Sequence, residues 1–571
     1  MLGLKSKKNE FRSLIWGVAL MSFTLFIFAP VILFLGNQSD MGFSLMDFLP
    51  YVLAYGICLV LLVILIGYCL PKKGLAVLSA FVFAIGLALY LQGNFMNANY
   101  GTLDGRGIDW SGFGSYPYVN SAVWILLIVA CISLALKRNE LFGKIVRYVA
   151  LFIIIVQAVS LVVSLASAPF KNTDKNYSVT SDLSTSFSRN NNTIVLVVDA
   201  CDTQYFQRIL SESPETADIF DGFTYFADFV GSYSKTKMSL PYLLTGKWYE
   251  NRETVQDFLN DAYKDVPLYG KLKENNYTIG IYTGRGYLSE DAVELTDNMV
   301  RSGTQIGDHW GVSKQLLKFS FFSYFPHVFK PYFEFYSGAF EKYYVISTGE
   351  PLYSRNNYAF QQFCNADFSL TDENAFRFYH ITGSHLPCDM DENGNYVGPW
   401  KSDAYHQTLG VFKSVKTFFE SLKKLGIYDN STIFVTADHG RFDEGLAFPT
   451  MLVKQPNERG KVKVSNAPVS QSEFHATILK CAGIETDGES FFDIGEDEIR
   501  ERRFLYYPTS YQNGGYLPTL TEYKIGPGLT GTETGYYYTK DGITDTPVDY
   551  RKTNDSFQIL EGLKNLISPQ K

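Results

Sequence analysis

The chain has 571 residues, of which 46% are hydrophobic and 16% are aromatic. This length predicts more than one domain. The net charge of −8 is spread along the sequence, and lysine and arginine cluster only beside long apolar runs. A nucleic-acid-binding protein, which needs a basic surface, is therefore not expected.

Five apolar runs without charged residues occupy the first third of the chain. Each is close to the ~20 residues that a helix needs to cross a bilayer. A signal peptide explains one such run but not five. Residues 1–168 are therefore predicted to form a membrane domain of five transmembrane helices. The runs cover 14–36, 48–70, 75–91, 119–136 and 148–168.

Basic residues alternate between the loops that join these runs. They occur before the first run, after the second and after the fourth, whereas the other two loops contain few. Basic loops stay in the cytoplasm, so the chain after residue 168 is expected outside the cell membrane, extracellular or periplasmic. The basic residues are Lys5, Lys7, Lys8, Arg12, Lys72, Lys73, Lys137, Arg138, Lys144 and Arg147.

The remaining sequence divides into three parts. Residues 169–192 are rich in serine, asparagine and threonine and are predicted to be a linker. In 193–500, apolar runs alternate with helical patterns such as 405–425, which ends at Gly426, and this predicts a mainly parallel sheet between helices. Residues 501–571 begin with tyrosine-rich alternating stretches and predict a small antiparallel β subdomain. The predicted buried strands cover 193–199, 278–283, 376–381 and 432–436.

Two of these strands end in residues of the types that commonly bind metals. The first ends at Asp199, and the last leads into Asp438-His439-Gly440. Ligands of α/β sheets gather at the carboxyl ends of the strands, and an unpaired carboxylate is costly in so apolar a segment. Metal ligation explains Asp199, as would capping of the helix after Thr203; the neighbouring Asp202 is the better candidate for that cap.

A third segment, 234–246, contains a hydroxyl that can act as a nucleophile. Thr236 stands three residues before Ser239-Leu240-Pro241, where a helix is predicted to begin with Ser239 as its cap. Thr236 would lie near the helix N-terminus, which favours phosphate. A divalent cation would activate its hydroxyl. Ser232 and Ser234 are rival nucleophiles.

Together these residues resemble the alkaline phosphatase/sulfatase superfamily over about 190–490. The closer resemblance is to its membrane-anchored branch, the lipoteichoic acid synthases and phosphoethanolamine transferases. It implies one divalent cation, Mn²⁺ or Zn²⁺, as cofactor. It also implies that His385, in a Ser-His-x-Pro segment, contacts the substrate phosphate and transfers a proton to the leaving group, while His380 is structural. The implied metal ligands are Asp199, Thr236, Asp438 and His439.

The chain departs from parts of the family pattern. Sulfatases mature a cysteine or serine to formylglycine, whereas this chain has Thr236 there, and Met238 and Leu240 replace their proline and arginine. Sulfatase chemistry is therefore disfavoured. No histidine follows the Asp-His-Gly motif in 441–447, which favours a single metal. Of the seven cysteines, Cys364 and Cys388 are either bridged or unpaired thiols.

The function that the resemblance implies is transfer of a phosphoalcohol headgroup, glycerol phosphate or phosphoethanolamine, from a membrane phospholipid. The acceptor would be a surface glycan or a teichoic-acid-like polymer, and Thr236 would carry a phospho-threonine intermediate. Two alternatives stay open. One is a phosphodiesterase or sulfuric ester hydrolase of the same superfamily, and the other is a non-catalytic membrane scaffold.

Overall fold

The computed structural model describes most of the chain and divides it into two compact units. One unit comprises Met1–Lys175 and Gly303–Pro351, and the other comprises Asn176–Ser302 and Leu352–Lys571. The described residues are 7–38, 41–100, 108, 110–168, 177–333, 337–346, 353–441, 448–508, 510, 512, 515–529, 531–539 and 542–545.

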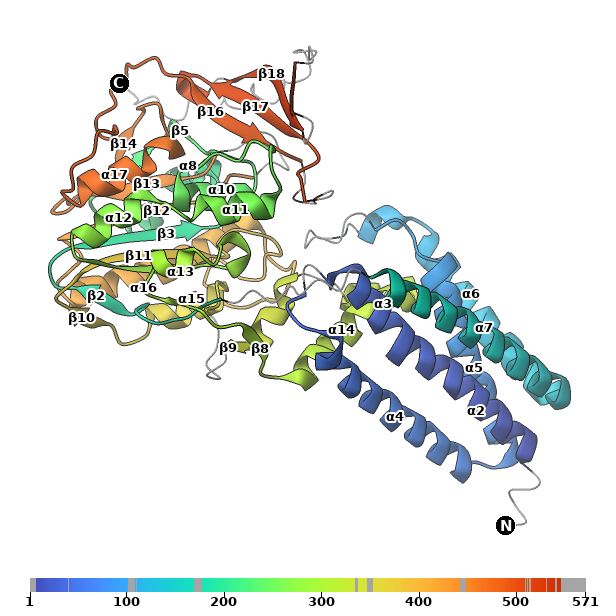
Figure 1. Ribbon diagram of the computed structural model, residues 1–571. Helices are drawn as coiled ribbons and strands as arrows, with labels where there is room; N and C mark the ends of the chain where they lie inside the picture. The colour runs from blue at the N-terminus through green and yellow to red at the C-terminus, as the bar shows by residue number, and fades with distance from the viewer. Residues whose placement is uncertain are drawn as a thin grey trace. The chain divides into compact units, whose positions relative to one another are not determined.

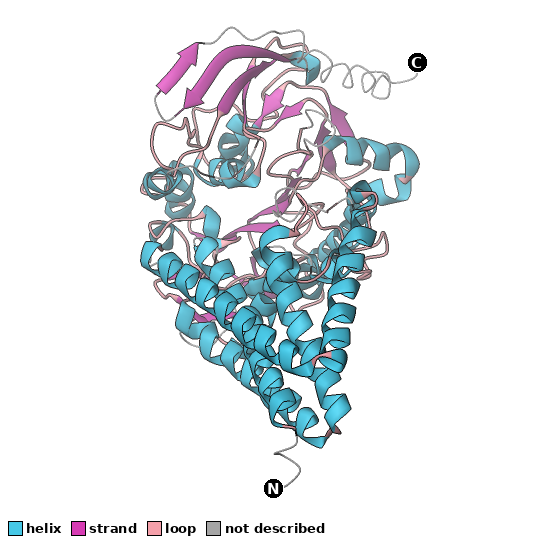
Figure 2. Cartoon of the chain, turned by 90° about the vertical axis from the view of Figure 1, so that its right-hand side faces the viewer, coloured by secondary structure: helices cyan, strands magenta, loops and turns pink. Residues whose placement is uncertain are grey.

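The first unit contains five helices that are long and apolar enough to cross a membrane (Figures 1 and 2). The five predicted runs are confirmed as helices. The first and third are mostly buried against the others, at 61% and 56% of their most apolar stretch, whereas the other three are only 17% buried and expose apolar side chains. The spans are Lys8–Gly36 (α2, η1 and α3), Leu45–Cys69 (α4), Lys72–Phe95 (α5), Tyr116–Lys137 (α6) and Asn139–Ser167 (α7).

Glycines bring the two central spans together. A Cβ atom on Gly17 would lie 3.0 Å from the backbone nitrogen of Phe83, and one on Gly86 would lie 3.1 Å from that of Met21. Small residues at such crossings let helix backbones approach closely. This close packing helps to hold helices together in the lipid bilayer, where the hydrophobic effect does not.

The first unit also includes a segment from far along the sequence. The segment 303–351, which lies within the range assigned to the α/β domain from sequence, packs with the membrane helices instead. Its longest helix, α14, contacts α3, α4 and α5 (Figure 1). We call 303–351 the insertion. It contains β8 (Thr304–Ile306), α14 (His309–Tyr324), η5 (His327–Phe333), η6 (Ser337–Tyr343) and β9 (Tyr344–Ile346).

The second unit is built on a seven-stranded sheet with the order β14-β4-β13-β12-β3-β11-β6 (Figure 1). The four strands β12, β3, β11 and β6 are parallel neighbours, and β13 pairs antiparallel with both β12 and β4. The predicted mainly parallel sheet is confirmed. The strands are β3 (Asn192–Val198), β4 (Phe223–Phe226), β6 (Tyr277–Tyr282), β11 (Asn374–Ile381), β12 (Ser431–Thr436), β13 (Met451–Lys454) and β14 (Lys463–Ser465).

Helices cover both faces of this sheet. In β3, Val195 and Val197 join the core under α10, α11, α12 and α17, whereas Ile194 and Leu196 join the core under α8, α15 and α16. A strand buried on both faces is the reason for its continuous apolar sequence. These helices are α8 (Thr203–Glu212), α10 (Thr236–Thr245), α11 (Val255–Ala262), α12 (Pro267–Glu274), α15 (Asn357–Cys364), α16 (Ala404–Lys424) and α17 (Phe474–Cys481).

Short strands form where the sequence predicted a linker. Within 177–192, β1 (Ser178–Val179) pairs with β7 (Met299–Val300), and β2 (Ser186–Ser188) pairs with β10 (Ser369–Thr371). Strands of two or three residues are too short to show apolar periodicity, so the composition of this stretch could not indicate them.

The C-terminal strands form the predicted antiparallel sheet, in the order β16-β17-β18-β19. A buried ion pair joins it to the rest of the unit, because Arg502 on β16 contacts Asp228, with 2.8 Å from Nη1 to Oδ1. Burial raises the pKa of Asp228 and lowers that of Arg502. The strands are β16 (Arg502–Tyr506), β17 (Leu520–Ile525), β18 (Gly531–Thr539) and β19 (Gly542–Asp545).

We expect Arg502→Met to lower the free energy of unfolding by about 3 kcal/mol or more, because it leaves the Asp228 carboxylate buried without its cation. Chemical unfolding of the detergent-solubilised full chain measures this. Arg459→Met is the matched control, since Arg459 is 71% exposed in its pair with Asp429 and should contribute no more than ~1 kcal/mol. Equal unfolding midpoints for the two variants would contradict the assignment.

Candidate metal centre and active site

The parallel register places two carboxylates at the same level of the sheet. Thr436 on β12 is paired with Val197 on β3. Two residues further along each chain come Asp438 and Asp199, and both side chains are fully buried. The predicted gathering of acids at these strand ends is therefore observed.

A close approach between two loops shapes the backbone here. Gly383 follows β11 with φ at +57°, and a Cβ atom on it would lie 2.6 Å from the backbone nitrogen of Asp199. Asp199 in turn donates from its backbone N to Ile381 O at 3.1 Å and accepts from Ser384 N at 2.9 Å. Only glycine fits both this conformation and this contact, and the contact fixes the position of the Asp199 backbone.

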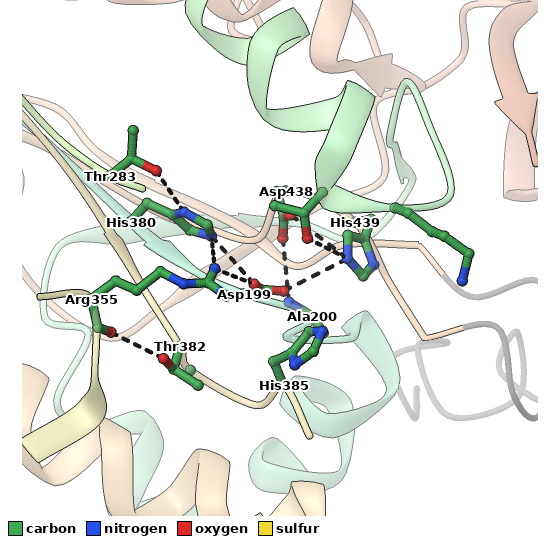
Figure 3. A network of polar contacts seen from close by, with 12 residues as sticks. Asp199, Ala200, Thr283, Arg355, His380, Thr382, His385, Asp438 and His439 are labelled. Carbon is green, nitrogen blue, oxygen red and sulfur yellow. Dashed lines mark hydrogen bonds and ion pairs between the residues drawn. The ribbon is translucent and has the colours of Figure 1, made fainter. Parts of the chain in front are cut away.

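His439 faces both carboxylates (Figure 3). Its Nδ1 donates to Gly440 O at 2.7 Å, so Nε2 carries the lone pair. Nε2 lies 3.6 Å from Asp199 Oδ1 and 3.6 Å from Asp438 Oδ2. A backbone carbonyl that fixes the histidine tautomer in this way is typical of metal-binding histidines.

Thr236 completes the group, because its Oγ1 lies 3.1 Å from His439 Nε2. Thr236 is the first residue of α10, so this helix begins three residues before the predicted cap, Ser239. The hydroxyl of Tyr507 holds this turn: it accepts from Met238 N at 3.1 Å and donates to Lys235 O at 2.8 Å. The Ser239 hydroxyl donates back to Lys235 O at 3.0 Å and does not cap the helix.

The two rival serines make hydrogen bonds elsewhere. Ser232 Oγ donates to Gln471 Oε1 at 2.6 Å. Ser234 Oγ donates to Tyr507 O at 2.9 Å and accepts from Tyr507 N at 3.0 Å. Of the three hydroxyls, that of Thr236 contacts His439.

Among the residues that the structure describes, one oxygen of each carboxylate is buried without a hydrogen-bond partner, Oδ1 of Asp199 and Oδ2 of Asp438. These oxygens face an imidazole lone pair, and three electron-rich atoms so close together repel one another unless a cation lies between them. The residues therefore fit a divalent cation. Mixed oxygen and nitrogen ligands suit Mn²⁺ or Zn²⁺.

His380, expected to be structural, lies beside the same carboxylate. Its Nε2 is 3.3 Å from Asp199 Oδ2, and its Nδ1 is 2.9 Å from Thr283 Oγ1. Ligand atoms of Asp199, His380 and Asp438 all lie within 4.8 Å of one another. His380 is thus a further candidate metal ligand that was not predicted from the sequence. Its position one residue before the end of β11 could have indicated this role, because ligands gather at strand ends.

Arg355 is a second residue that the sequence did not reveal (Figure 3). Its Nη1 donates to Asp199 Oδ2 at 3.0 Å. Its backbone oxygen accepts from Thr382 N at 2.7 Å, which holds it beside the loop after β11. Burial raises the pKa of Asp199, but His385, the hydrogen bond from His380 and the Arg355 charge together outweigh burial and keep that pKa well below its ordinary value.

The remaining predicted residues lie at the edge of the group. His385 is half-buried on the loop after β11, where its Nδ1 donates to Leu386 O at 2.5 Å, and it is close enough to Asp199 to influence that carboxyl group. Asp202 caps α8, as expected, by accepting from Gln204 N at 2.7 Å. Cys364 and Cys388 are not joined by a disulfide. Most of the stretch after the Asp-His-Gly motif, 442–447, lies outside the described residues.

We expect Gly383→Ala to displace Asp199 and to abolish metal binding, because the added methyl group meets the Asp199 backbone. Gly426→Ala is the matched control: its φ is +74°, but no atom lies within 4 Å of the added Cβ. It should lose only the ~1 kcal/mol of a left-handed conformation. Metal titration and unfolding of both variants measure the difference, and equal behaviour would show that the contact is unimportant.

Comparison with known proteins gives matches among solved structures. No family model matches the chain, and no curated protein matches it. The phosphonate monoester hydrolase SpPMH from Silicibacter pomeroyi is 14% identical, with 66% of this chain and 94% of that chain covered and a TM-score of 0.36. The lipoteichoic acid synthase LtaP from Listeria monocytogenes is 13% identical, with 67% and 93% covered and a TM-score of 0.34.

A third match is a protein in the alkaline phosphatase superfamily from Vibrio parahaemolyticus. It is 13% identical, with 69% of this chain and 92% of that chain covered and a TM-score of 0.32. At these identities and TM-scores the likeness carries no argument about the reaction. The five candidate membrane spans and the geometry of the site therefore stand on the structure of this chain alone.

Proposed function

We propose that this protein is a membrane-bound, metal-dependent phosphotransferase with Thr236 as its nucleophile. It would move a phosphoalcohol headgroup, glycerol phosphate or phosphoethanolamine, from a phospholipid to a surface glycan or teichoic-acid-like polymer. The supporting observation is the pair of unpartnered carboxylate oxygens, on Asp199 and Asp438, that face His439 together with the Thr236 hydroxyl.

In this proposal Asp199, Asp438, His439 and Thr236 hold one Mn²⁺ or Zn²⁺ ion. A bound divalent cation lowers the pKa of a ligating hydroxyl and screens the charge of a phosphate. The protein contributes a hydroxyl fixed in place, since Thr236 begins a helix whose first turn is held by Tyr507. The N-terminus of that helix favours the phosphate that the hydroxyl attacks.

The reaction would proceed in two displacements. The Thr236 alkoxide forms a bond to phosphorus, the bond from phosphorus to the diacylglycerol oxygen breaks, and protonated His385 gives that oxygen a proton. Neutral His385 then takes the proton of an acceptor hydroxyl, whose oxygen bonds to phosphorus as Thr236 leaves. Each displacement needs a base or an acid, a role that His385 would fill, and its side chain is only half-buried.

Arg355 would bind the phosphate during both steps. It contacts Asp199 through Nη1, and its side chain is 21% exposed, so the residue lies at the accessible edge of the site. A planar guanidinium with several donors suits phosphate oxygens. Arg355 therefore offsets the charge of Asp199 and offers donors to a substrate in the same place.

The membrane helices support a lipid donor. Five spans would hold the protein at the bilayer that contains the phospholipid, and the basic loops favour an active site on the extracytoplasmic side. Water could replace the glycan acceptor in the second displacement and turn the same site into a phosphodiesterase. Dependence of product formation on an added acceptor separates these two reactions.

The covalent step can be tested directly by mass spectrometry. The full chain in nanodiscs is incubated with phosphatidylglycerol or phosphatidylethanolamine and Mn²⁺ or Zn²⁺, and its intact mass and peptides are measured. We expect a glycerol phosphate or ethanolamine phosphate adduct on Thr236. Thr236→Ala should abolish the adduct and lower the rate by at least about three orders of magnitude, as loss of a nucleophile does.

Thr245→Ala is the matched control for this experiment. Thr245 ends the same helix, is equally buried, and donates its hydroxyl hydrogen bond to Pro241 O rather than into the site. It should form the adduct normally. Full turnover by Thr236→Ala, or an adduct on another residue, would refute Thr236 as the nucleophile.

A further inference from the structure

The insertion is attached to the membrane helices through specific contacts. The His309 ring stacks on Tyr51 of α4 with 5.0 Å between centroids, and its Nδ1 donates to Asp47 O at 2.8 Å. At the other end of α14, Tyr324 lies against α5 where only glycine fits, because a Cβ atom on Gly93 would be 2.4 Å from its ring. The insertion is therefore an integral part of the membrane unit.

A buried polar cluster strengthens this attachment. Lys330 is fully buried, and its Nζ donates to Asn97 Oδ1 at 2.9 Å. Burial lowers its pKa to about 7. His327 donates from its backbone N to Asn120 Oδ1 at 2.9 Å, and its ring is hydrogen-bonded to the Tyr100 hydroxyl at 2.9 Å. These bonds connect η5 to the ends of α5 and α6.

The position of Trp310 shows how deep the insertion lies along the spans. Its ring packs edge-on against Tyr51 and Tyr55, at 5.0 and 5.2 Å between centroids. These tyrosines are about 9 and 15 Å along α4 from its first residue, at 1.5 Å per residue. At 25 residues, α4 is longer than a bilayer core requires. Trp310 thus packs beside the first three turns of α4, near the N-terminal end of this span.

The insertion exposes large apolar side chains at this end of the unit. Trp310, Phe329 and Tyr332 are 50%, 50% and 73% exposed, and Val328 is 45% exposed. The neighbouring span α4 is exposed as well, since only 17% of its most apolar stretch is buried. Tryptophan and tyrosine prefer the boundary between headgroups and acyl chains.

Two lysines accompany these side chains. Lys314 and Lys318 follow Trp310 at intervals of four, so the three share one face of α14, and all three are exposed. Among the residues that the structure describes, neither lysine has an ion-pair or hydrogen-bond partner. Such a stripe of tryptophan and lysine is typical of helices that lie in a membrane interface.

We propose that the insertion is a membrane-interface element whose exposed face contacts phospholipid. The side chains of Trp310, Val328, Phe329 and Tyr332 would enter the boundary between headgroups and acyl chains, and Lys314 and Lys318 would contact lipid phosphates. A segment within the sequence of the α/β domain would thereby contact the lipid bilayer. This inference does not depend on the proposed reaction.

Spin-label accessibility in nanodiscs tests the proposal on the full chain. Nitroxide labels are attached at Phe329→Cys and Tyr332→Cys, in a chain whose Cys58, Cys69 and Cys481 are alanine. Molecular oxygen concentrates in lipid, whereas a neutral nickel chelate stays in water. We expect both labels to be severalfold more accessible to oxygen than to the chelate.

Ile499→Cys provides the control, because Ile499 is a 90% exposed apolar residue of the other unit. Its label should favour the nickel chelate. Two outcomes would overturn the proposal: labels at 329 and 332 that match the one at 499, which would indicate water, or labels shielded from both reagents, which would indicate a protein partner over this face. Lys314→Gln with Lys318→Gln should also weaken retention of anionic phospholipid during purification, and unchanged retention would refute the lysine contacts.

Discussion

The repulsion between two buried carboxylates is the constraint on which this structure depends. Asp199 and Asp438 are fully buried at adjacent strand ends, and one oxygen of each has no hydrogen-bond partner within the described part of the chain. Such an arrangement is stable only with positive charge beside it. Arg355 and a divalent cation are the two sources of that charge in our proposal. The same constraint explains why the surrounding backbone is so closely specified, at Gly383 and at the turn that presents Thr236.

The insertion connects this site to the membrane along the sequence. The chain leaves the α/β domain after β7, forms the insertion, and returns to deliver Arg355, only nine residues after Ile346 ends β9. If the insertion binds the lipid interface, the segment that contains Arg355 directly follows a part of the chain that contacts the membrane. The residues proposed to contact lipid and the residue proposed to bind phosphate are therefore neighbours along the sequence.

Much of the fold and of the site could be predicted because the signals were local. Continuous apolar runs indicated the spans and the buried strands, and Asp199 and Asp438-His439 followed such runs directly. Arg355 depends on contacts between distant segments, which no spacing reveals. His380 lies one residue before the end of β11, a position that could have indicated a ligand, but it was expected to be structural. The insertion was not predicted, because the apolar face of α14 has the same sequence pattern whether it packs on a sheet or on membrane helices. The start of α10 was misplaced because Tyr507, 271 residues after Thr236, holds the first turn.

Metal stoichiometry tests the central claim most directly. The full chain, purified in detergent, is titrated with Mn²⁺ while free ion is followed by electron paramagnetic resonance. The proposal predicts one tightly bound ion per chain. It also predicts that Asp438→Asn lowers the metal affinity by at least about 100-fold. Loss of a residue that only hydrogen-bonds to a ligand can already cost that much, and loss of the ligand itself should cost no less. Asp389→Asn, at a half-buried carboxyl outside the group, should bind normally. Equal binding by Asp438→Asn and the unmodified chain would contradict the metal centre.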